Sequence, residues 1–386
     1  MAFLEKSFQM DKPKIYLSSP HMGEDELSNV QEAFATNWIS PAGPFIGQFE
    51  NDLAAYCGTA GAAVVQSGTA AIHLALRLLE IQQGDLIVCQ SFTFIGSSNP
   101  ILYEKATPVF IDSEASTWNM CPNALEEAIV DLNKKGKRPK AIIVVHLYGM
   151  PAKMKEIMTI AYRYNIPVIE DAAEALGSSI DGKACGSFGD FGILSFNGNK
   201  IITTSGGGAL LSNNLVALQK ARFLATQAKD NAPHYEHTQM GYNYRMSNIV
   251  AAIGVGQLKV LDQRVAARKA NHVFYQALLA NVEGVQFLEE PEGYFSNRWL
   301  SCIIIDSATT GVSREDLRLV LEKENIESRP LWKPMHMQPL FSNFDYYGTD
   351  FIEKLFLDGI CLPSGSNLTP QEKERISSQL KVVFSC

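Results

Sequence analysis

The sequence predicts an α/β protein with a mainly parallel, seven-stranded sheet in its first part and a smaller α+β domain at its end. Up to about residue 260, short β-branched segments alternate with helix-like ones. Several of the short segments are apolar throughout, which is typical of strands buried on both faces of a parallel sheet. Beyond Val260 a long helical segment is followed by shorter strands and helices, which indicates a second unit.

Seven short apolar segments are expected to form the large sheet, with helices between them. These segments are 63–66, 86–89, 107–112, 141–146, 166–171, 191–196 and 207–212. Between the strands, 69–80 has apolar residues at helical spacing, and 151–164 begins with a proline and stops before Asn165.

The second unit is expected to open with a long helix rich in alanine and arginine. Its elements are a helix at 261–281, strands at 285–288 and 299–306, a helix at 313–324 and a strand at 326–331. The last helix begins with Thr369, Pro370 and, two residues later, Glu372, which is the pattern of an N-cap, a first-turn proline and an acidic third position. We therefore expect an N-terminal extension at 1–14, a large α/β domain at 15–260 and a small α+β domain at 261–386.

Composition excludes several classes of protein. The chain has 386 residues and a formal charge of −8, and no basic tract that would favour nucleic acid. Its apolar stretches are too short to cross a membrane, and its first residues lack the apolar region of a secretory signal. The seven cysteines are scattered and odd in number, so free thiols in a reducing cytoplasm are expected.

A first candidate site is the tripeptide Ser67-Gly68-Thr69, which follows an apolar strand and begins a helix. Free N–H groups and the helix dipole at such a point favour an anion, typically a phosphate. An ordinary strand–helix turn capped by the threonine is the alternative.

A second candidate is the acidic pair Glu170-Asp171 at the end of a buried strand. Ligands of α/β proteins bind at such strand ends, and a carboxylate there can hold a proton on a ligand nitrogen. An acid that caps the following helix is the simpler interpretation of this pair alone.

A third candidate is Lys200, which follows a strand that ends near Ser195 and precedes the glycine-rich run 206–208. Lysines usually lie on solvated faces, whereas a lysine held in a cleft can lose its proton and bond to an aldehyde. A flexible hairpin is the alternative.

Together the three candidates provide what pyridoxal phosphate requires: a phosphate cradle, a carboxylate for the ring nitrogen and a reactive lysine. In order and spacing they resemble the DegT/DnrJ/EryC1/StrS family of sugar aminotransferases, from about Ile15 to the end of the chain. The resemblance implies the fold type I, aspartate aminotransferase-like architecture, and pyridoxal 5'-phosphate as cofactor. It makes Lys200 the catalytic lysine that bonds to the cofactor, and Asp171 the partner of its ring nitrogen.

The resemblance also implies the remaining cofactor contacts. Phosphate contacts fall on Ser67, Gly68, Thr69 and Ser195. Phe94 matches the aromatic residue that stacks on the cofactor ring, and Glu174 lies where the family has Glu, Gln or His beside the cofactor hydroxyl. Asn243 matches an asparagine that reaches the phosphate in the neighbouring subunit, which implies a homodimer with shared active sites.

A closer resemblance is to the 4-aminotransferases that act on UDP-4-keto-6-deoxy-N-acetylglucosamine in the bacillosamine route to bacterial surface glycans. Segments 196–208, 297–300 and 329–336 carry it. The implied amino donor is L-glutamate. Because a nucleotide sugar carries two phosphates and this chain is net negative, local cations must bind it. The candidates are Arg245, Lys333, His336 and Arg298.

Other interpretations stay open. The substrate could be a GDP- or dTDP-linked keto-sugar, or the chain could be a non-enzymatic regulator with the same fold. The sugar 3-dehydratases of the family have histidine in place of the lysine, and Lys200 argues against them. A nicotinamide oxidoreductase would need a GxGxxG motif at the start of a helix, which the sequence lacks. His234 and His237 have the spacing of metal ligands, but no third ligand is near, so no metal is expected.

Overall fold

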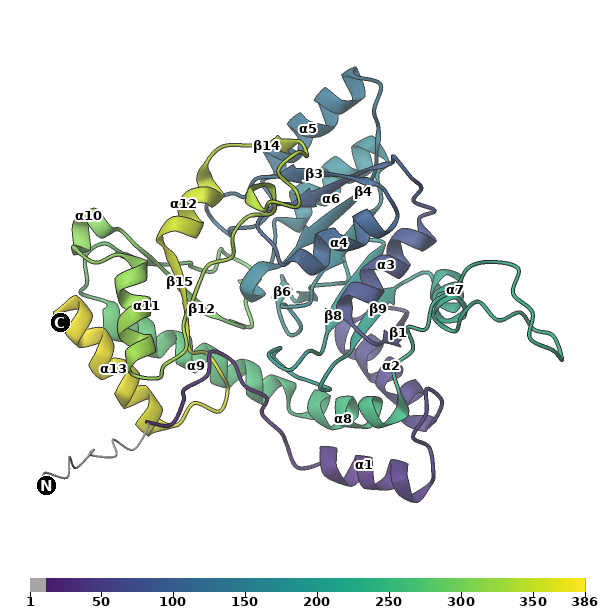
Figure 1. The fold of residues 1–386 in the computed structure, drawn as a ribbon, viewed down its shortest axis with the longest axis horizontal. Helices are drawn as coiled ribbons and strands as arrows, with labels where there is room; N and C mark the ends of the chain where they lie inside the picture. Colours follow the sequence, from purple (N-terminus) through teal and green to yellow (C-terminus); the bar gives the residue numbers. More distant parts are fainter. Residues whose placement is uncertain (1–11, 386) are drawn as a thin grey trace, which may run out of the picture.

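The computed structural model describes residues 12–385, and its centre is a large twisted sheet (Figure 1). Within these residues the sheet has eight strands, in the order β1 (Gly61–Val65), β9 (Gly208–Ser212), β8 (Phe191–Ser195), β5 (Val168–Asp171), β4 (Pro139–Val145), β2 (Leu86–Gln90), β3 (Thr107–Ile111) and β14 (Tyr346–Tyr347). Among these strands, β9 pairs antiparallel with β1 and with β8, and all the other neighbouring pairs are parallel. The mainly parallel α/β fold predicted from the apolar segments is therefore confirmed.

The predicted number of strands needs one correction. All seven predicted segments form strands, but β14 adds an eighth by pairing with β3 through Tyr346 and Tyr347. This short strand comes from the last part of the chain, and a two-residue pairing has no apolar run that a sequence pattern could reveal.

Helices cover both faces of the large sheet. The helices of this part are α1 (Glu26–Ala35), α2 (Pro44–Cys57), α3 (Gly68–Leu78), α4 (Ile95–Tyr103), α5 (Pro122–Lys134), α6 (Met154–Tyr164), α7 (Leu215–Ala225) and α8 (Asn248–Lys259). One face packs against α3, α4 and α7, and the other against α2 and α8 at one end and α5 and α6 at the other. In β1, alternate side chains enter the two cores, as expected of a strand buried on both faces.

Helix α6 begins three residues later than the predicted proline start at 151. The backbone N–H of Ala152 donates to His146 Nδ1 at 3.0 Å, which holds this segment outside the helix. The predicted end is confirmed, since Asn165 follows in the left-handed conformation.

The last part of the chain forms a second, four-stranded antiparallel sheet. Its order is β10 (Val285–Phe287), β12 (Ser301–Ile305), β15 (Gly359–Leu362) and β13 (Arg329–Pro330). The helices around it are α9 (Leu261–Leu279), α10 (Ser307–Thr310), α11 (Arg314–Lys323), α12 (Phe351–Asp358) and α13 (Pro370–Phe384). The predicted strand at 326–331 is shorter than expected, and the central strand β15 was not predicted. The capping box of Thr369 and Glu372 is present.

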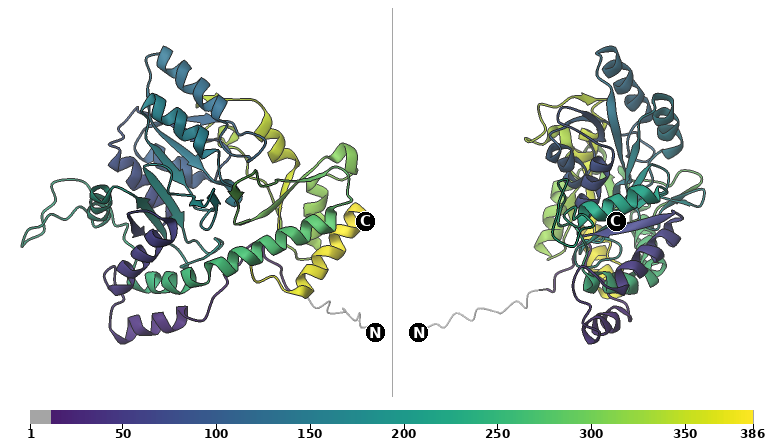
Figure 2. Two further views of the ribbon diagram at one scale, coloured as in Figure 1. Left: turned by 180° about the vertical axis from the view of Figure 1, so that it is seen from behind. Right: turned by 90° about the vertical axis from the view of Figure 1, so that its right-hand side faces the viewer.

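The two parts are linked by several contacts. Helices α8 and α9 run end to end along one edge of the molecule, from beside α1 toward α13 (Figures 1 and 2). A small sheet joins the hairpin of β6 (Ser179–Ile180) and β7 (Lys183–Ala184) to β11 (Tyr294–Phe295). The division of the chain near residue 260 stays a prediction, and most of the predicted N-terminal extension lies outside the described residues.

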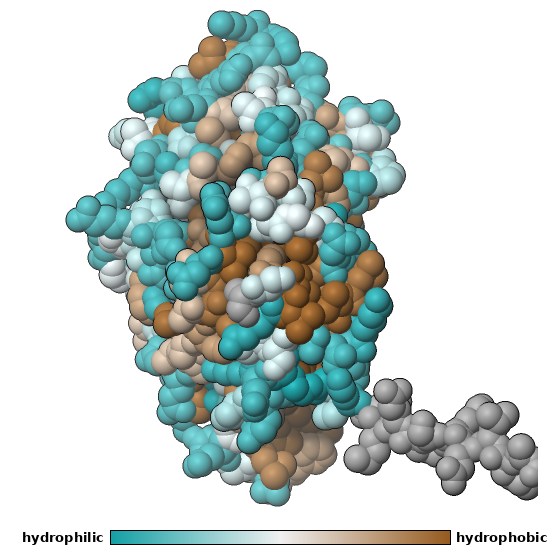
Figure 3. Space-filling model, turned by 90° about the vertical axis from the view of Figure 1, so that its left-hand side faces the viewer, coloured by the Kyte–Doolittle hydropathy of each residue, from teal (hydrophilic) through white to brown (hydrophobic). Residues whose placement is uncertain are grey.

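Seen from the side of α10 and α13, the surface is largely hydrophilic at its margins, and apolar side chains gather near its centre (Figure 3). Within residues 12–385, no helix has both the length and the apolar character needed to cross a membrane.

Candidate active site

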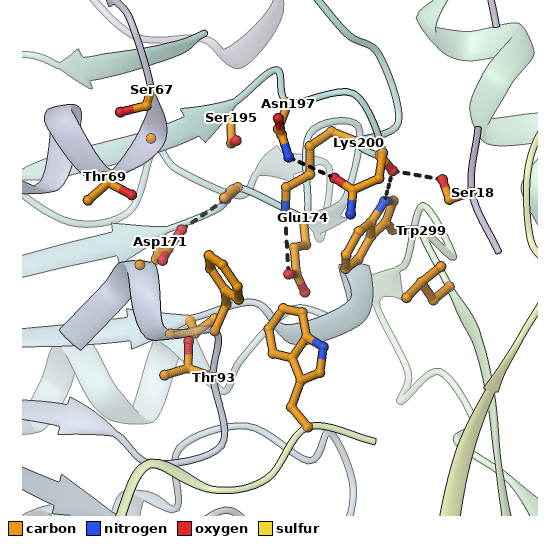
Figure 4. Close-up of a pocket in the computed structure, with 18 of the residues that line it drawn as sticks. Ser18, Ser67, Thr69, Thr93, Asp171, Glu174, Ser195, Asn197, Lys200 and Trp299 are labelled. Atoms are coloured by element: carbon orange, nitrogen blue, oxygen red, sulfur yellow. Dashed lines mark hydrogen bonds and ion pairs between the residues drawn. The ribbon is translucent and has the colours of Figure 1, made fainter. Parts of the chain in front are cut away.

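A cavity of about 720 Å³ lies where strands β1, β5 and β8 of the large sheet end (Figure 4). Its lining includes these strand ends, the loop before β9, and segments 17–18, 93–96, 299–300 and 327–333. The predicted residues Ser67, Gly68, Thr69, Phe94, Asp171, Glu174, Ser195, Lys200 and Lys333 all line it. Residues from distant parts of the sequence therefore meet in one cavity at the position where α/β proteins bind ligands.

The start of α3 forms one end of the cavity. Ser67 is the N-cap, and its hydroxyl accepts a hydrogen bond from the Ala70 N–H at 3.0 Å. The first N–H groups of a helix have no acceptor within the helix, and with the helix dipole they favour an anion. The hydroxyls of Thr69 and Ser195 line the same end (Figure 4). This donor set fits a phosphate group.

Gly208 in β9 lets the sheet approach this turn closely. A Cβ atom at Gly208 would lie 2.4 Å from the Gly68 nitrogen and 2.4 Å from the Ser67 carbonyl carbon. Both are backbone atoms that cannot move aside as a flexible side chain could. Within the glycine-rich run near Lys200, Gly208 is therefore needed to build this turn.

Asp171 is the last residue of β5, and its carboxylate is buried at the floor of the cavity. The Ser97 hydroxyl donates to Oδ2 at 2.6 Å, and the Ala173 N–H donates to Oδ1 at 3.2 Å. A carboxylate in this position fits a protonated ring nitrogen.

The neighbouring acid, Glu170, has a structural role. Its side chain is fully buried and accepts hydrogen bonds from the backbone N–H groups of Gly186, Phe188 and Gly189, and it contacts His146 Nε2 at 3.0 Å. Adjacent residues of a strand face opposite sides of the sheet, so only Asp171 of this pair reaches the cavity.

Lys200 and Glu174 face each other within the cavity (Figure 4). Lys200 Nζ lies 3.3 Å from Glu174 Oε1 and 4.3 Å from the centre of the Trp299 ring. Burial raises the pKa of Glu174 from its ordinary value of 4.5 to about 7, although the Lys200 ammonium and the hydrogen bond from the Tyr148 N–H act to lower it. Glu174 can therefore gain or lose a proton near neutral pH beside the Lys200 amine.

An aromatic wall, formed by Phe94, Tyr148, Trp299 and Trp332, stands beside this pair. Phe94 and Trp332 have ring centroids 5.5 Å apart, and Trp332 lies 5.3 Å from Tyr148 and 6.3 Å from Trp299. Trp299 is held by a hydrogen bond from its Nε1 to the Asn199 carbonyl at 2.8 Å. Sequence reasoning missed both tryptophans, although they lie within the segments 297–300 and 329–336 that carried the closer resemblance.

Among the predicted substrate-binding cations, Lys333 lines the cavity, whereas Arg298 and His336 are engaged elsewhere. Arg298 donates to the Leu288 carbonyl at 2.7 Å and pairs with Glu290 at 3.2 Å. The expectation that Arg298 offers a free cation is corrected, because a buried guanidinium needs these partners. Arg329, which was not predicted, lines the cavity mouth and pairs with Glu327 at 2.9 Å.

His336 is held between two partners outside the cavity. It contacts Ser91 Oγ at 2.8 Å and Glu353 Oε1 at 3.2 Å, and its ring stacks on Tyr346 at 3.8 Å. Its place beside the substrate is therefore also corrected. Arg245 lies outside the cavity as well, where its backbone pairs with Val65.

Asn243 lies on the loop between α7 and α8, part of which protrudes from the body of the molecule (Figures 1 and 2). Its side chain is exposed and does not line the cavity of its own chain. Its role in the site of a second subunit stays a prediction.

Comparison with known proteins agrees with this geometry. Residues 20–381 match the family described as the DegT/DnrJ/EryC1/StrS aminotransferase family. The chain is 54% identical to EpsN of Bacillus subtilis (strain 168), named as a pyridoxal phosphate-dependent aminotransferase, over 96% of both chains. It is 37% identical to the GDP-perosamine synthase of Caulobacter vibrioides, over 97% of this chain and 99% of that one. The crystal structure of the aminotransferase TlmJ from Streptoalloteichus hindustanus superposes with a TM-score of 0.89 at 28% identity, covering 96% of this chain and 99% of that one.

Proposed function

The chain belongs to the DegT/DnrJ/EryC1/StrS aminotransferase family and is a pyridoxal phosphate-dependent sugar aminotransferase, and we propose that its acceptor is UDP-4-keto-6-deoxy-N-acetylglucosamine. The proposed amino donor is L-glutamate, and the product carries the amine at C4 of the sugar. The observation that carries this proposal is that segments 299–300 and 329–333 line the cavity that holds Lys200. These segments lie within the regions that resemble the UDP-sugar 4-aminotransferases.

The residues of the cavity suit the cofactor. We assign its phosphate to the start of α3, with Ser67, Thr69 and Ser195, and its ring nitrogen to Asp171. Bound pyridoxal phosphate supplies an electron sink for the electron pair left when a proton leaves the substrate carbon. Phe94, whose ring is exposed within the cavity, is proposed to cover one face of the cofactor ring.

Lys200 is proposed to move the proton of the reaction. Its Nζ atom takes a proton from Cα of the amino donor, and in the second half of the reaction it returns a proton to C4 of the sugar. Glu174 Oε1, at 3.3 Å, can hold a proton beside Nζ because its pKa is about 7. The face of Trp299 stabilises the ammonium form of Lys200 from the other side.

The diphosphate of the nucleotide sugar is proposed to bind at the cavity mouth. Lys333 and Arg329 are cations in the cavity lining, and the protein as a whole carries a formal charge of −8. Local positive charge is therefore needed to bring in a substrate with two phosphates. The aromatic wall offers an apolar surface to the deoxy carbon and acetyl group of the sugar.

We propose further that the enzyme is a cytoplasmic homodimer in which Asn243 completes the phosphate site of the second subunit. The protruding loop that carries Asn243 supports this proposal, since its exposed side chains include Tyr235 and Met240. The six described cysteines are free, which fits a reducing compartment.

A GDP-linked 4-keto sugar is the second candidate acceptor, because the chain is 37% identical to a GDP-perosamine synthase over nearly its full length. The test incubates purified protein with pyridoxal phosphate, L-glutamate and, in parallel, the UDP-, GDP- and dTDP-linked 4-keto sugars. Products are identified by mass spectrometry and NMR. Amination of the UDP sugar alone is the expected result. If the GDP sugar is aminated and the UDP sugar is not, the UDP-sugar proposal is wrong and the GDP-linked sugar is the acceptor.

A further inference from the structure

Two buried hydroxyls stand behind the carboxylate of Asp171. Ser97 Oγ donates to Asp171 Oδ2 at 2.6 Å, and Thr93 Oγ1 lies 2.7 Å from Ser97 Oγ. Thr93 and Ser97 are at most 1% exposed. Thr93 and Asp171 both line the cavity (Figure 4), and Ser97 connects them, so the three side chains form a continuous chain of hydrogen bonds from the cavity wall to the carboxylate.

The direction of this chain follows from its chemistry. An ionised carboxylate only accepts hydrogen bonds, and a hydroxyl has one proton to donate. Ser97 must therefore give its proton to Asp171, and it accepts in turn from Thr93. Hydrogen bonds that point the same way polarise one another, and those made to a charged group are the strong ones.

The position of Ser97 argues against a local capping role. Ser97 is the third residue of α4, where a hydroxyl would ordinarily satisfy backbone groups of the first turn. Its Oγ reaches instead a carboxylate 74 residues away in the sequence. The N-cap position of this helix is held by Phe94, which makes no side-chain capping bond.

We propose that Ser97, supported by Thr93, is a positioning residue that orients the carboxylate of Asp171 toward the ring nitrogen of the cofactor. This inference rests on the proposed function, in which Asp171 is that partner. The other titratable groups near Asp171 are Glu174 and Lys200 in the cavity and the buried thiol of Cys89, and the substitutions of Ser97 and Thr93 below remove no hydrogen bond from any of the three.

The chain offers a matched control next to Ser97. Ser98 lies on the same helix and is also fully buried, but its Oγ contacts Cys89 Sγ at 3.7 Å and not Asp171. Ser98→Ala therefore removes a buried hydroxyl from α4 without touching the carboxylate. For Thr93, Thr93→Val removes the hydroxyl and Thr93→Ser keeps it.

The experiment follows the visible absorbance of the cofactor-loaded protein as a function of pH, without any substrate. The quantity compared is the pH at the midpoint of the absorbance change. Asp171→Asn gives the direction and the full size of the shift in this midpoint. Ser97→Ala should shift the midpoint in the same direction by about one pH unit, since a hydrogen bond to a charged group is worth roughly that much. Thr93→Val should give a smaller shift, and Thr93→Ser and Ser98→Ala should match the wild type.

The outcomes separate the inference from the proposed function. If Asp171→Asn shifts the midpoint but Ser97→Ala and Thr93→Val do not, the positioning role of Ser97 is wrong, and the assignment of Asp171 to the ring nitrogen is retained. If Asp171→Asn itself has the midpoint of the wild type, the assignment of Asp171 falls, and the inference with it. If Ser97→Ala does not fold, as judged by thermal unfolding without cofactor, the two Thr93 variants still test the positioning role. A midpoint shift in Thr93→Val but not in Thr93→Ser supports this role, and the absence of a shift in both contradicts it.

Discussion

Replacing Glu174 by Gln should change how the stability of the cofactor-free protein depends on pH. The folded protein holds the Glu174 proton up to a pKa of about 7, whereas the unfolded chain releases it near the ordinary value of 4.5. Between these two values the folded state binds more protons than the unfolded state. The free energy of unfolding of the wild type therefore falls as pH rises through this window, and Gln, which does not ionise, removes this contribution.

The size of the effect follows from the pKa shift. At about 1.4 kcal/mol for each pKa unit, a rise from 4.5 to about 7 corresponds to about 3 kcal/mol. Glutamine keeps the shape of the side chain and can still accept the hydrogen bond from the Tyr148 N–H. The attraction of the ionised carboxylate to Lys200 is already among the causes that set the pKa of Glu174 at about 7, so the loss of this attraction in the variant is included in the figure above.

The measurement is urea-induced unfolding of both proteins without cofactor, at several values from about pH 5 to about pH 8, since bound ligand would add its own stabilisation. The free energy of unfolding of the variant relative to the wild type should rise by about 2 to 3 kcal/mol across that range. Glu32→Gln, which removes one charge from the exposed face of α1, is the control and should show no such rise. A constant difference between Glu174→Gln and the wild type would refute the argument from burial.

Three further predictions concern the cofactor site. Gly208→Ala should abolish cofactor binding and lower the free energy of unfolding by about 2 kcal/mol, because its Cβ would lie 2.4 Å from backbone atoms. Gly206→Ala, whose Cβ would have no protein atom within 4 Å, should match the wild type in the same unfolding assay. Lys200→Ala should abolish turnover and change the absorbance of bound cofactor, and measurable turnover would show that another amine does the chemistry. Asn243→Ala should speed cofactor loss during dialysis while the protein stays folded, and unchanged retention would contradict the role across the subunit interface.

Much of the fold could be predicted because its signals are local. The seven apolar segments became strands of the large sheet, since strands buried on both faces carry that pattern wherever they lie. The capping box at Thr369 and the N-cap at Ser67 depend on neighbours three residues away. The turn at Ser67, Lys200 and the carboxylate at the end of β5, which the cavity brings together, could be singled out for the same reason, and their order along the chain pointed to the family.

Contacts between distant segments could not be predicted in this way. The sequence does not say that Arg298 will meet Glu290, or that His336 will lie between Ser91 and Glu353, so both were expected beside the substrate. The tertiary structure decides which carboxylate lies next to a cationic side chain, and a local motif does not record this contact. The strand β14 escaped prediction because its two residues gain their partner only when the end of the chain folds back onto β3.

The sequence by itself therefore determined the α/β architecture and the family, and it singled out the residues proposed for the cofactor site, because each depends on short patterns that repeat wherever that chemistry is used. The tertiary structure alone decided which acid of the pair at the end of β5 reaches the cavity, and which aromatic rings surround Lys200. It also placed Ser97 behind Asp171. Each of these outcomes depends on the packing of segments far apart in the chain, and no local pattern records it.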